Sequence, residues 1–262
     1  MALLELEQLR KTFGGVVALN GVDLTVAEGE IRGLVGPNGS GKSTCINVIS
    51  GVYRPSGGRV RFRGRSIGGL ASHRISQAGV ARTFQNVRLF RQLTAIENVL
   101  VTAEARAPYR VMSCLVRGAR VRRHERALRA DAMDALAIVG LEEHADTVAE
   151  SLPYGRQRML EIARALAGRP ELLLLDEPAA GLNDQETREL AERIADIRAR
   201  GISIVLIEHK MSLVLGICDR IAVLDFGEPI ADGTPDEIRS DPRVIEAYLG
   251  QPELEEGPAS LS

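Results

Sequence analysis

The chain has 262 residues, of which 45% are hydrophobic and 26% are charged, which is the profile of a soluble globular protein with a large core. Its 33 basic and 35 acidic side chains give a net charge of −2, which argues against a nucleic-acid-binding domain, because such domains are usually basic. No stretch approaches the roughly 20 apolar residues of a membrane-spanning helix, and three scattered cysteines do not make a disulfide framework.

The first seventy residues are predicted to be rich in β-strands. Residues 3–9 alternate loosely between apolar and polar side chains. Residues 16–36 have the pattern of short strands that are broken at Asn20 and Gly21 and again at Glu28 and Gly29. Residues 58–67 alternate with a period of two, which is typical of an antiparallel strand with one solvent-exposed face.

The rest of the chain is predicted to change from helices to alternating strands and helices. Residues from about 94 to 140 suit helices, and 122–141 are strongly amphipathic. Beyond them, the apolar runs 171–178 and 202–209 flank a helical pattern that ends at Gly201. This order indicates βα units and a parallel sheet.

Three further segments are predicted from their local sequence. Residues 220–235 are expected to form a hairpin with turns at Phe226 and Gly227 and at Asp232 and Gly233. The acidic tail, 251–262, is expected to be disordered. Eight arginines between 106 and 129 favour a solvated helical face, and the alternative is a patch that lies near anionic lipid headgroups or a membrane partner.

A phosphate-binding loop is predicted at residues 36–44, GPNGSGKST, which follow an apolar run and precede a helical pattern. Its glycines let backbone N–H groups turn toward phosphate oxygens. Lys42 offers a charge between the β- and γ-phosphates, and Ser43 offers a hydroxyl to Mg²⁺. Thr44 continues a helix start that favours anions. The alternative is a glycine-rich turn with a chance lysine.

The run LLLLDEP supplies two acids at the end of a buried strand. Asp176 is expected at the carboxyl edge of the sheet, where Mg²⁺ needs a carboxylate. Glu177 follows, where it can orient or deprotonate water. The alternative is a strand that ends in a solvated acidic turn. Together with the phosphate loop, these acids predict hydrolysis of a nucleoside triphosphate.

The order of these motifs resembles the ATP-binding cassette family, and within it the ATPase subunits of branched-chain amino acid importers, from residue 4 to about 250. Sequence segments such as DEPAAGLN, LIEHKMSLV and VIEAYLG favour that subgroup. The resemblance implies an α/β fold: a RecA-like P-loop NTPase core with a parallel sheet, an N-terminal antiparallel β-subdomain and an inserted α-helical subdomain. It implies one nucleotide-binding domain at 1–250, with the helical insertion at about 87–165.

The resemblance also implies residue roles. Phe13 matches the aromatic residue that stacks on adenine, Gln85 the glutamine that senses Mg²⁺ and water, and His209 the histidine that holds the γ-phosphate. The alternatives are a Phe13 that packs over the small sheet, a Gln85 at a solvated strand end and a His209 that is a satisfied polar cap. The implied catalytic residues are Glu177, His209, Gln85 and Lys42; the implied ATP-binding residues are Phe13, Gly36, Pro37, Asn38, Gly39, Ser40, Gly41, Lys42, Ser43, Thr44, Gln85, Tyr154 and Gly155; the implied Mg²⁺ ligands are Ser43, Gln85 and Asp176.

Residues 152–156, LPYGR, fall on the family signature, which is usually L-S-G-G-Q, and are called the signature turn below. Pro153 replaces its serine, Tyr154 its first glycine and Arg156 its glutamine. We expect Pro153 at the first helical position with Ser151 as the cap, so that N–H groups around Tyr154 and Gly155 still reach phosphate. In AAGLND, Asn183 stands where an aspartate is common in the loop that faces the partner subunit.

The family's partners follow from the resemblance. Two cassettes, identical or different, would face head to tail, with each ATP between one phosphate loop and the other signature turn. Transmembrane permease subunits would hold the chain at the cytoplasmic face of the membrane, with a permease helix on Val87, Leu89 and Phe90, and a substrate-binding protein would act indirectly.

Other functions remain as alternatives. One is an importer ATPase for another small polar solute such as urea, and another is a soluble cassette ATPase that acts on DNA or ribosomes. A GTPase normally needs an N-K-x-D sequence, which is absent, and a small-molecule kinase needs an acceptor pocket that the helical middle does not suggest.

Overall fold

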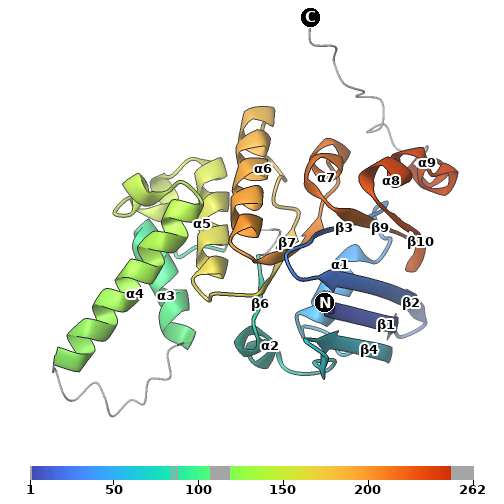
Figure 1. Cartoon of the computed structure of the whole chain (residues 1–262), viewed down its shortest axis with the longest axis horizontal. Helices are drawn as coiled ribbons and strands as arrows, with labels where there is room; N and C mark the ends of the chain where they lie inside the picture. Colours follow the sequence, from blue (N-terminus) through green and yellow to red (C-terminus); the bar gives the residue numbers. More distant parts are fainter. Residues whose placement is uncertain (1, 84, 86–87, 107–118, 249–262) are drawn as a thin grey trace, which may run out of the picture. The chain divides into compact units, whose positions relative to one another are not determined.

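The computed structural model describes residues 2–83, 85, 88–106 and 119–248 (Figure 1). The chain divides into a first unit, Met1–Ala71 with Val205–Ser262, and a second unit, Ser72–Ile204, which we describe one at a time. None of the helices in the described ranges is long and apolar enough to span a bilayer. The predicted tail at 251–262, Val87 and the arginine segment between 107 and 118 lie outside the described residues.

The N-terminal part of the first unit is an antiparallel sheet, as predicted. Its strand order is β2-β1-β4-β5, and each strand pairs with its neighbours in the antiparallel sense. Alternate side chains such as Leu4, Leu6 and Leu24 are buried on one face. The four strands are β1 (Ala2–Phe13), β2 (Val16–Ala27), β4 (Gly57–Phe62) and β5 (Arg65–Ser66).

Two predictions about this sheet are wrong. Strand β2 continues through Asn20 and Gly21, because the pairing shifts there from Leu9–Val22 to Arg10–Asn20 and Gly21, at φ 75°, becomes the extra residue of a β-bulge. Residues 58–67 form a hairpin rather than one strand. Arg63 and Gly64 turn the chain with φ values of 50° and 72°, so that β5 folds back on β4.

The second sheet of the first unit runs in the order β10-β9-β3-β8. Strand β3 pairs with β9 in parallel, and β9 and β10 form the predicted hairpin around Phe226 and Gly227. The predicted turn at Asp232 and Gly233 is wrong, because both residues pair with β9. The elements are β3 (Ile31–Val35), β8 (Ser203–Ile207, which begins in the second unit), β9 (Arg220–Asp225), β10 (Glu228–Gly233), α1 (Lys42–Ile49), α7 (Met211–Ile217), α8 (Pro235–Ser240) and α9 (Pro242–Tyr248).

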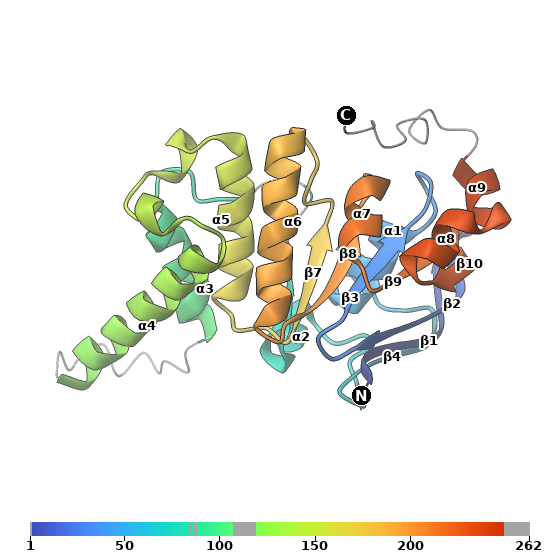
Figure 2. The ribbon, with the colours of Figure 1, turned by 45° about the horizontal axis from the view of Figure 1, so that its top comes forward.

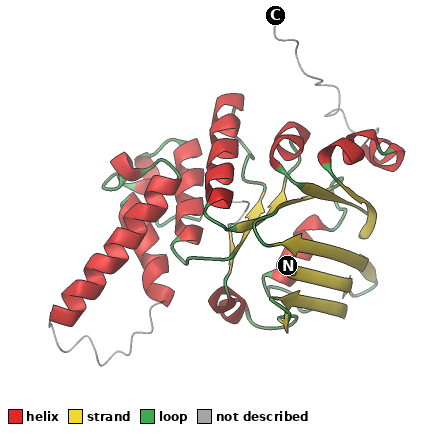
Figure 3. Ribbon diagram, in the orientation of Figure 1, coloured by secondary structure: helices red, strands yellow, loops and turns green. Residues whose placement is uncertain are grey.

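The second unit contains a cluster of helices and the buried strand β7, which pairs with β6 in parallel (Figure 3). Helices α3, α4 and α5 pack on one another, and α5 and α6 lie side by side in two views (Figures 1 and 2). Within the part of the chain that the structure describes, the predicted helices, both buried strands and the parallel pairing are therefore confirmed. The elements are α2 (Ser72–Ala78), β6 (Val80–Arg82), α3 (Ala95–Arg106), α4 (Ala119–Ile138), the 3₁₀ turns η2 (Glu142–His144) and η3 (Ala149–Ser151), α5 (Tyr154–Leu166), β7 (Leu172–Asp176) and α6 (Asp184–Ala199).

Candidate nucleotide site

The loop at residues 36–44 connects the fully buried strand β3 to helix α1 in the first unit. Two of its positions require glycine. At Gly36, φ is 148° and an added Cβ would lie 2.0 Å from the carbonyl oxygen of Leu224. At Gly41, φ is 101° and a Cβ would lie 2.7 Å from the carbonyl oxygen of Ala18. This strand–loop–helix arrangement is the context that a phosphate-binding loop needs.

The ammonium group of Lys42 lies inside this loop. Its Nζ donates hydrogen bonds to the carbonyl oxygens of Gly36 at 2.7 Å and Pro37 at 2.8 Å, and to Ser40 Oγ at 3.4 Å. Lys42 is only 5% exposed. The β9–β10 turn holds the loop from outside, since the Gly227 N–H donates to the carbonyl oxygen of Ser40. The loop therefore surrounds one fixed positive charge.

The remaining loop residues differ in exposure. Asn38 and Gly39 are exposed at the tip, Ser43 is exposed on the first turn of α1, and Thr44 beside it is half-buried. Helix α1 has Gly41 as its N-cap, and no side chain of the described residues caps it. Its first N–H groups, together with the helix dipole, are suited to an anion.

Phe13 and His209 also lie in the first unit. Phe13 is 40% exposed, its ring meets Tyr53 edge-on with 5.0 Å between centroids, and the ammonium group of Lys11 lies 4.6 Å from its centroid. One part of the ring is packed and another part is accessible to solvent. The structure is therefore compatible with both interpretations of Phe13, stacking on adenine and packing over the small sheet. His209 follows β8 half-buried, and its backbone N–H donates to Glu208 Oε2 at 3.1 Å.

Asp176 ends strand β7 in the second unit and is 5% exposed. A buried carboxylate needs compensation, and Arg82 supplies it with an Nη2–Oδ2 distance of 2.8 Å. The Asp176 N–H also faces Thr83 Oγ1 at 3.4 Å. The sequence interpretation missed Arg82, although its position at the end of β6, parallel to β7, could have suggested it.

Glu177 and Gln85 meet in the second unit. The Nε2 group of Gln85 donates to Glu177 Oε2 at 2.7 Å. Glu177 has φ 49°, which is unusual for a residue with a side chain, and such strain clusters at functional sites. The structure thus brings the predicted Gln85, Asp176 and Glu177 to the ends of two neighbouring strands, β6 and β7.

The signature turn differs from the prediction by one residue. Pro153 is the N-cap of α5, with φ −54° and ψ 153°, and the helix begins at Tyr154. The predicted Ser151 cap is wrong, because Ser151 lies in η3 and its Oγ donates to the carbonyl oxygen of Val148 at 2.7 Å. No described side chain caps α5, so the N–H groups of Tyr154 and Gly155 still point out of the helix end.

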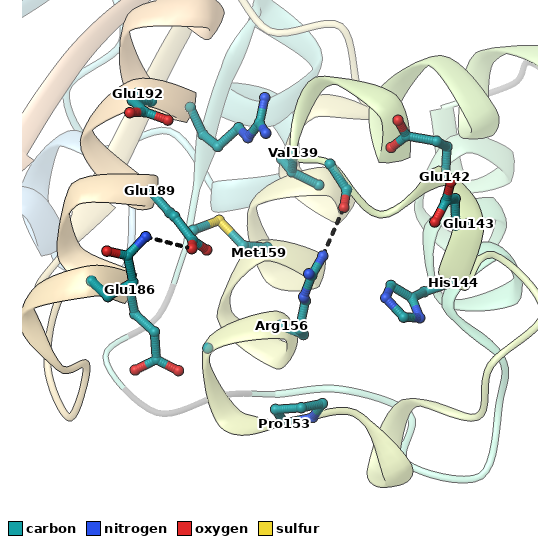
Figure 4. Close-up of a pocket in the computed structure, with 14 residues that line it drawn as sticks. Val139, Glu142, Glu143, His144, Pro153, Arg156, Met159, Glu186, Glu189 and Glu192 are labelled. Carbon is teal, nitrogen blue, oxygen red and sulfur yellow. Dashed lines mark hydrogen bonds between the residues drawn. The ribbon is translucent and has the colours of Figure 1, made fainter.

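A cavity of about 590 Å³ lies beside the signature turn, between α5, α6 and η2 (Figure 4). Arg156 crosses it and donates from Nη1 to the carbonyl oxygen of Gly140 at 2.9 Å. Five glutamates line it against two arginines, so a triphosphate would be repelled from its interior. The phosphate contact is thus expected at the exposed end of α5 and not inside this cavity. The charged lining residues are Glu142, Glu143, Glu186, Glu189, Glu192, Arg156 and Arg193.

Comparisons with known proteins agree with this geometry. The ABC transporter family model matches residues 19–180. The high-affinity branched-chain amino acid transport ATP-binding protein LivG of Salmonella typhimurium is 48% identical over 250 residues, which cover 95% of this chain and 98% of LivG. BraF of Pseudomonas aeruginosa, described in the same words, is 47% identical over the same shares. The chain belongs to the ABC transporter family.

Solved structures place this cassette among P-loop ATPases. The ADP conformation of MJ1267, an ATP-binding cassette of an ABC transporter, has a TM-score of 0.84 and 31% identity, and covers 96% of this chain and 100% of that one. A nucleotide-free cassette from an ABC transporter has a TM-score of 0.82. The predicted fold, a P-loop NTPase core with an antiparallel β-subdomain and helices, is confirmed, and the cassette is an ATP-binding ATPase.

Proposed function

We propose that this cassette is the ATP-hydrolysing subunit of an importer of branched-chain or related amino acids. The relatives at 47% and 48% identity, whose names state branched-chain amino acid transport, support the substrate class. A second family model, branched-chain amino acid ATP-binding cassette transporter, matches residues 228–253. We infer that residues 1–250 form one nucleotide-binding domain with a helical insertion at about 87–165, since the first family model spans parts of both units.

The phosphate loop would hold ATP through its backbone N–H groups, and Lys42 would offset the charge of the β- and γ-phosphates. The geometry of Gly36 and Gly41 supports this role, because a side chain at either position would collide with the backbone of a neighbouring strand. Phe13 would stack on adenine with its accessible part. The other residues of the nucleotide site are Pro37, Asn38, Gly39, Ser40, Ser43 and Thr44.

The hard oxygen donors of Ser43, Asp176 and Gln85 suit Mg²⁺, which prefers hydroxyl, carboxylate and amide oxygens together with water. The Arg82 contact leaves the other oxygen of the Asp176 carboxylate for this role. When bound, Mg²⁺ would neutralise charge on the β- and γ-phosphate oxygens. The donor chemistry therefore fits the ion.

The Gln85–Glu177 contact carries the catalytic proposal. Glu177 would align the attacking water, Gln85 would hold the Glu177 carboxylate in place, and His209 would contact the γ-phosphate. Phosphoryl transfer needs positioning and electrostatic stabilisation more than covalent chemistry. A 2.7 Å hydrogen bond between the amide and the carboxylate is the kind of orientation that such positioning requires.

The site would be completed by a second cassette, either another copy or a related chain. Two solved structures of one relative, the ATP-binding cassette MJ0796, are dimeric, and one of them has ADP and phosphate bound. The uncapped N–H groups at Tyr154 and Gly155 would face the γ-phosphate that the other subunit holds. Pro153 offers no hydroxyl there, and Asn183 would replace a charged contact by a neutral one.

Permease subunits would hold the cassette at the cytoplasmic face of the membrane, and a substrate-binding protein would act through them. A groove of about 520 Å³ in the second unit supports this docking, because Leu89 and Phe90 give apolar surface to a lining that also includes Arg82, Arg88, Glu161 and Arg164. Phe90 is half exposed, with the guanidinium of Arg164 at 5.2 Å from its ring centre. A short permease helix would fit such a groove.

Glu177→Gln tests the catalytic role. Glutamine preserves the shape and the contact to Gln85 but not the carboxylate, so ATP hydrolysis should fall about 10²–10⁴-fold while ATP binding persists. Glu192→Gln, an exposed substitution on α6, should hydrolyse ATP at the wild-type rate. Hydrolysis by Glu177→Gln at the wild-type rate would disprove the assignment.

The transport role needs a separate test. The cassette is purified from membranes with its partners, reconstituted in vesicles and assayed for ATP hydrolysis with leucine, isoleucine, valine or urea on the far side. Stimulation by the branched-chain amino acids supports the proposal. Stimulation by urea alone, or purification with no membrane partner, contradicts it.

A further inference from the structure

Helix α5 carries two buried charges one turn apart. Arg158 is 3% exposed and Glu161 is 5% exposed, and Arg158 Nη1 lies 3.5 Å from Glu161 Oε2. Taking two such groups out of water costs several kcal/mol per ion, and a buried ion pair is on that account weak evidence for stability. The role of this pair is therefore better explained by the other groups to which Arg158 and Glu161 are hydrogen-bonded.

Both charges hold the loop that carries Gln85. Arg158 Nη2 donates to the carbonyl oxygen of Gln85, and Glu161 Oε1 accepts from the Arg88 N–H at 3.4 Å. One turn further along α5, Arg164 donates to the carbonyl oxygen of Arg88. Side chains spaced by three residues along one helix thus bind both described ends of the segment 85–88.

Arg158 also contacts the signature turn. Its guanidinium carbon lies 5.5 Å from the centre of the Tyr154 ring, and Tyr154 Oη donates to the carbonyl oxygen of Ala180 at 3.3 Å. The Ala180 N–H donates in turn to the carbonyl oxygen of Glu177 at 3.2 Å. With the Gln85–Glu177 hydrogen bond, these contacts form a closed ring: Glu177, Gln85, Arg158, Tyr154, Ala180 and back.

We propose that Arg158 is a positioning residue for ATP hydrolysis. Its guanidinium holds the backbone of Gln85 against helix α5. The side-chain amide of Gln85, which contacts Glu177, and the signature turn therefore keep fixed positions relative to each other. The inference rests on the proposed roles of Gln85 and Glu177. Arginine suits this role because its planar guanidinium donates to Gln85 and Glu161 at the same time and presents a flat face to Tyr154. Lysine has a single ammonium group and cannot make all three contacts in this way.

The nature of the contact sets the expected effect. Arg158 binds the backbone of Gln85 and not its side chain, so it determines where the amide lies. A displacement of about 1 Å in a positioned group can cost about 10²-fold in rate. We expect Arg158→Lys, which keeps the charge opposite Glu161, to lower kcat by about 10- to 100-fold and to change KM little.

A double-mutant cycle on the full-length cassette tests this. We would measure kcat and KM for ATP in Arg158→Lys, Gln85→Ala and the double variant, and thermal unfolding for each. If Arg158 acts through Gln85, then Arg158→Lys should lower kcat less than about 3-fold in the Gln85→Ala background, because the group it positions is gone. Full additivity of the two effects would overturn the inference.

A control and a second variant keep the outcomes distinct. Arg193→Lys alters a pair with the same spacing, Arg193 and Asp196 on α6, whose side chains are both partly accessible to solvent, and should leave kcat unchanged. A wild-type kcat in Gln85→Ala would refute the proposed role of Gln85 instead. If Arg158→Lys unfolds, Arg158→Met with Glu161→Leu removes both charges; a folded protein with wild-type kcat then overturns the inference.

Discussion

The most direct test of the phosphate loop is Gly36→Ala, which adds one methyl group at the end of β3. The new Cβ would lie 2.0 Å from the carbonyl oxygen of Leu224 and 2.6 Å from Ser40 Oγ. Contacts under 3.0 Å do not occur for real Cβ atoms, so the backbone must move by at least about 1 Å, the difference between 3.0 and 2.0. Because β9, which carries Leu224, is paired with β3, the loop is the part that yields.

This displacement sets the magnitude. A shift of about 1 Å in groups that hold a reacting phosphate can cost about 10²-fold. At φ 148°, Gly36 has a backbone conformation that residues with a side chain rarely adopt, so alanine adds about 1–3 kcal/mol of backbone strain. We therefore expect Gly36→Ala to lower kcat/KM for ATP by about 10²-fold or more, with a smaller loss of thermal stability.

The matched control is Gly29→Ala in the turn between β2 and β3. Gly29 has φ 73°, and an added Cβ would meet no atom within 4 Å. Alanine at Gly29 should also carry backbone strain from a positive φ but should not move the loop, so this variant should bind and hydrolyse ATP normally. Nucleotide titration, phosphate release and thermal melts compare the two variants. Equal ATP affinity in Gly36→Ala and Gly29→Ala would refute the steric reasoning.

Three further predictions concern other elements. In a Glu177→Gln background, Pro153→Ser should tighten ATP-dependent dimers by 10-fold or more in sedimentation, since a hydrogen bond to a charged group contributes about 1.5–3 kcal/mol; unchanged dimers mean that the hydroxyl was never limiting. Thr234→Ala removes the capping box of α8 and should cost about 1 kcal/mol in urea unfolding. Burial raises the pKa of the Cys45 and Cys218 thiols from 9.0 to about 12, so the unfolded chain loses these protons at a lower pH than the folded chain. The free energy of unfolding should therefore fall as the pH rises from 9.0 to about 12, and alanine at both positions should reduce this fall.

Much of the fold was predictable because its strongest signals are local. The runs at β7 and β8 are buried on both faces, so their apolar character is continuous and needs no partner to be recognised. The strand break that was wrongly predicted at Asn20 and Gly21 has a different cause. A glycine at positive φ serves a bulge as readily as a turn, and the register opposite β2 decides which it is at Gly21. That register is information that the local sequence does not contain.

The candidate site divides in the same way. The phosphate loop is nine consecutive residues, so its strand, glycines and lysine could be predicted together. Arg82 meets Asp176 from 94 positions away, and Arg158 meets Gln85 from 73 positions away. No spacing rule along the chain predicts such pairs, because parallel pairing and helix packing create them.

The substitutions in the signature turn are best understood through their contacts. Tyr154, in the place of a small glycine, packs against Gly181, where φ is 79° and a Cβ would lie 3.0 Å from the tyrosine ring. Arg156 is bound to Gly140 within the same unit. Both substituted side chains therefore contact the cassette's own loops, and no side chain of the described residues caps the N-terminus of α5. Under the proposed role of this turn, Pro153 removes one hydroxyl donor from the phosphate contact without removing the contact, which is why Pro153→Ser should strengthen dimerisation and not create it.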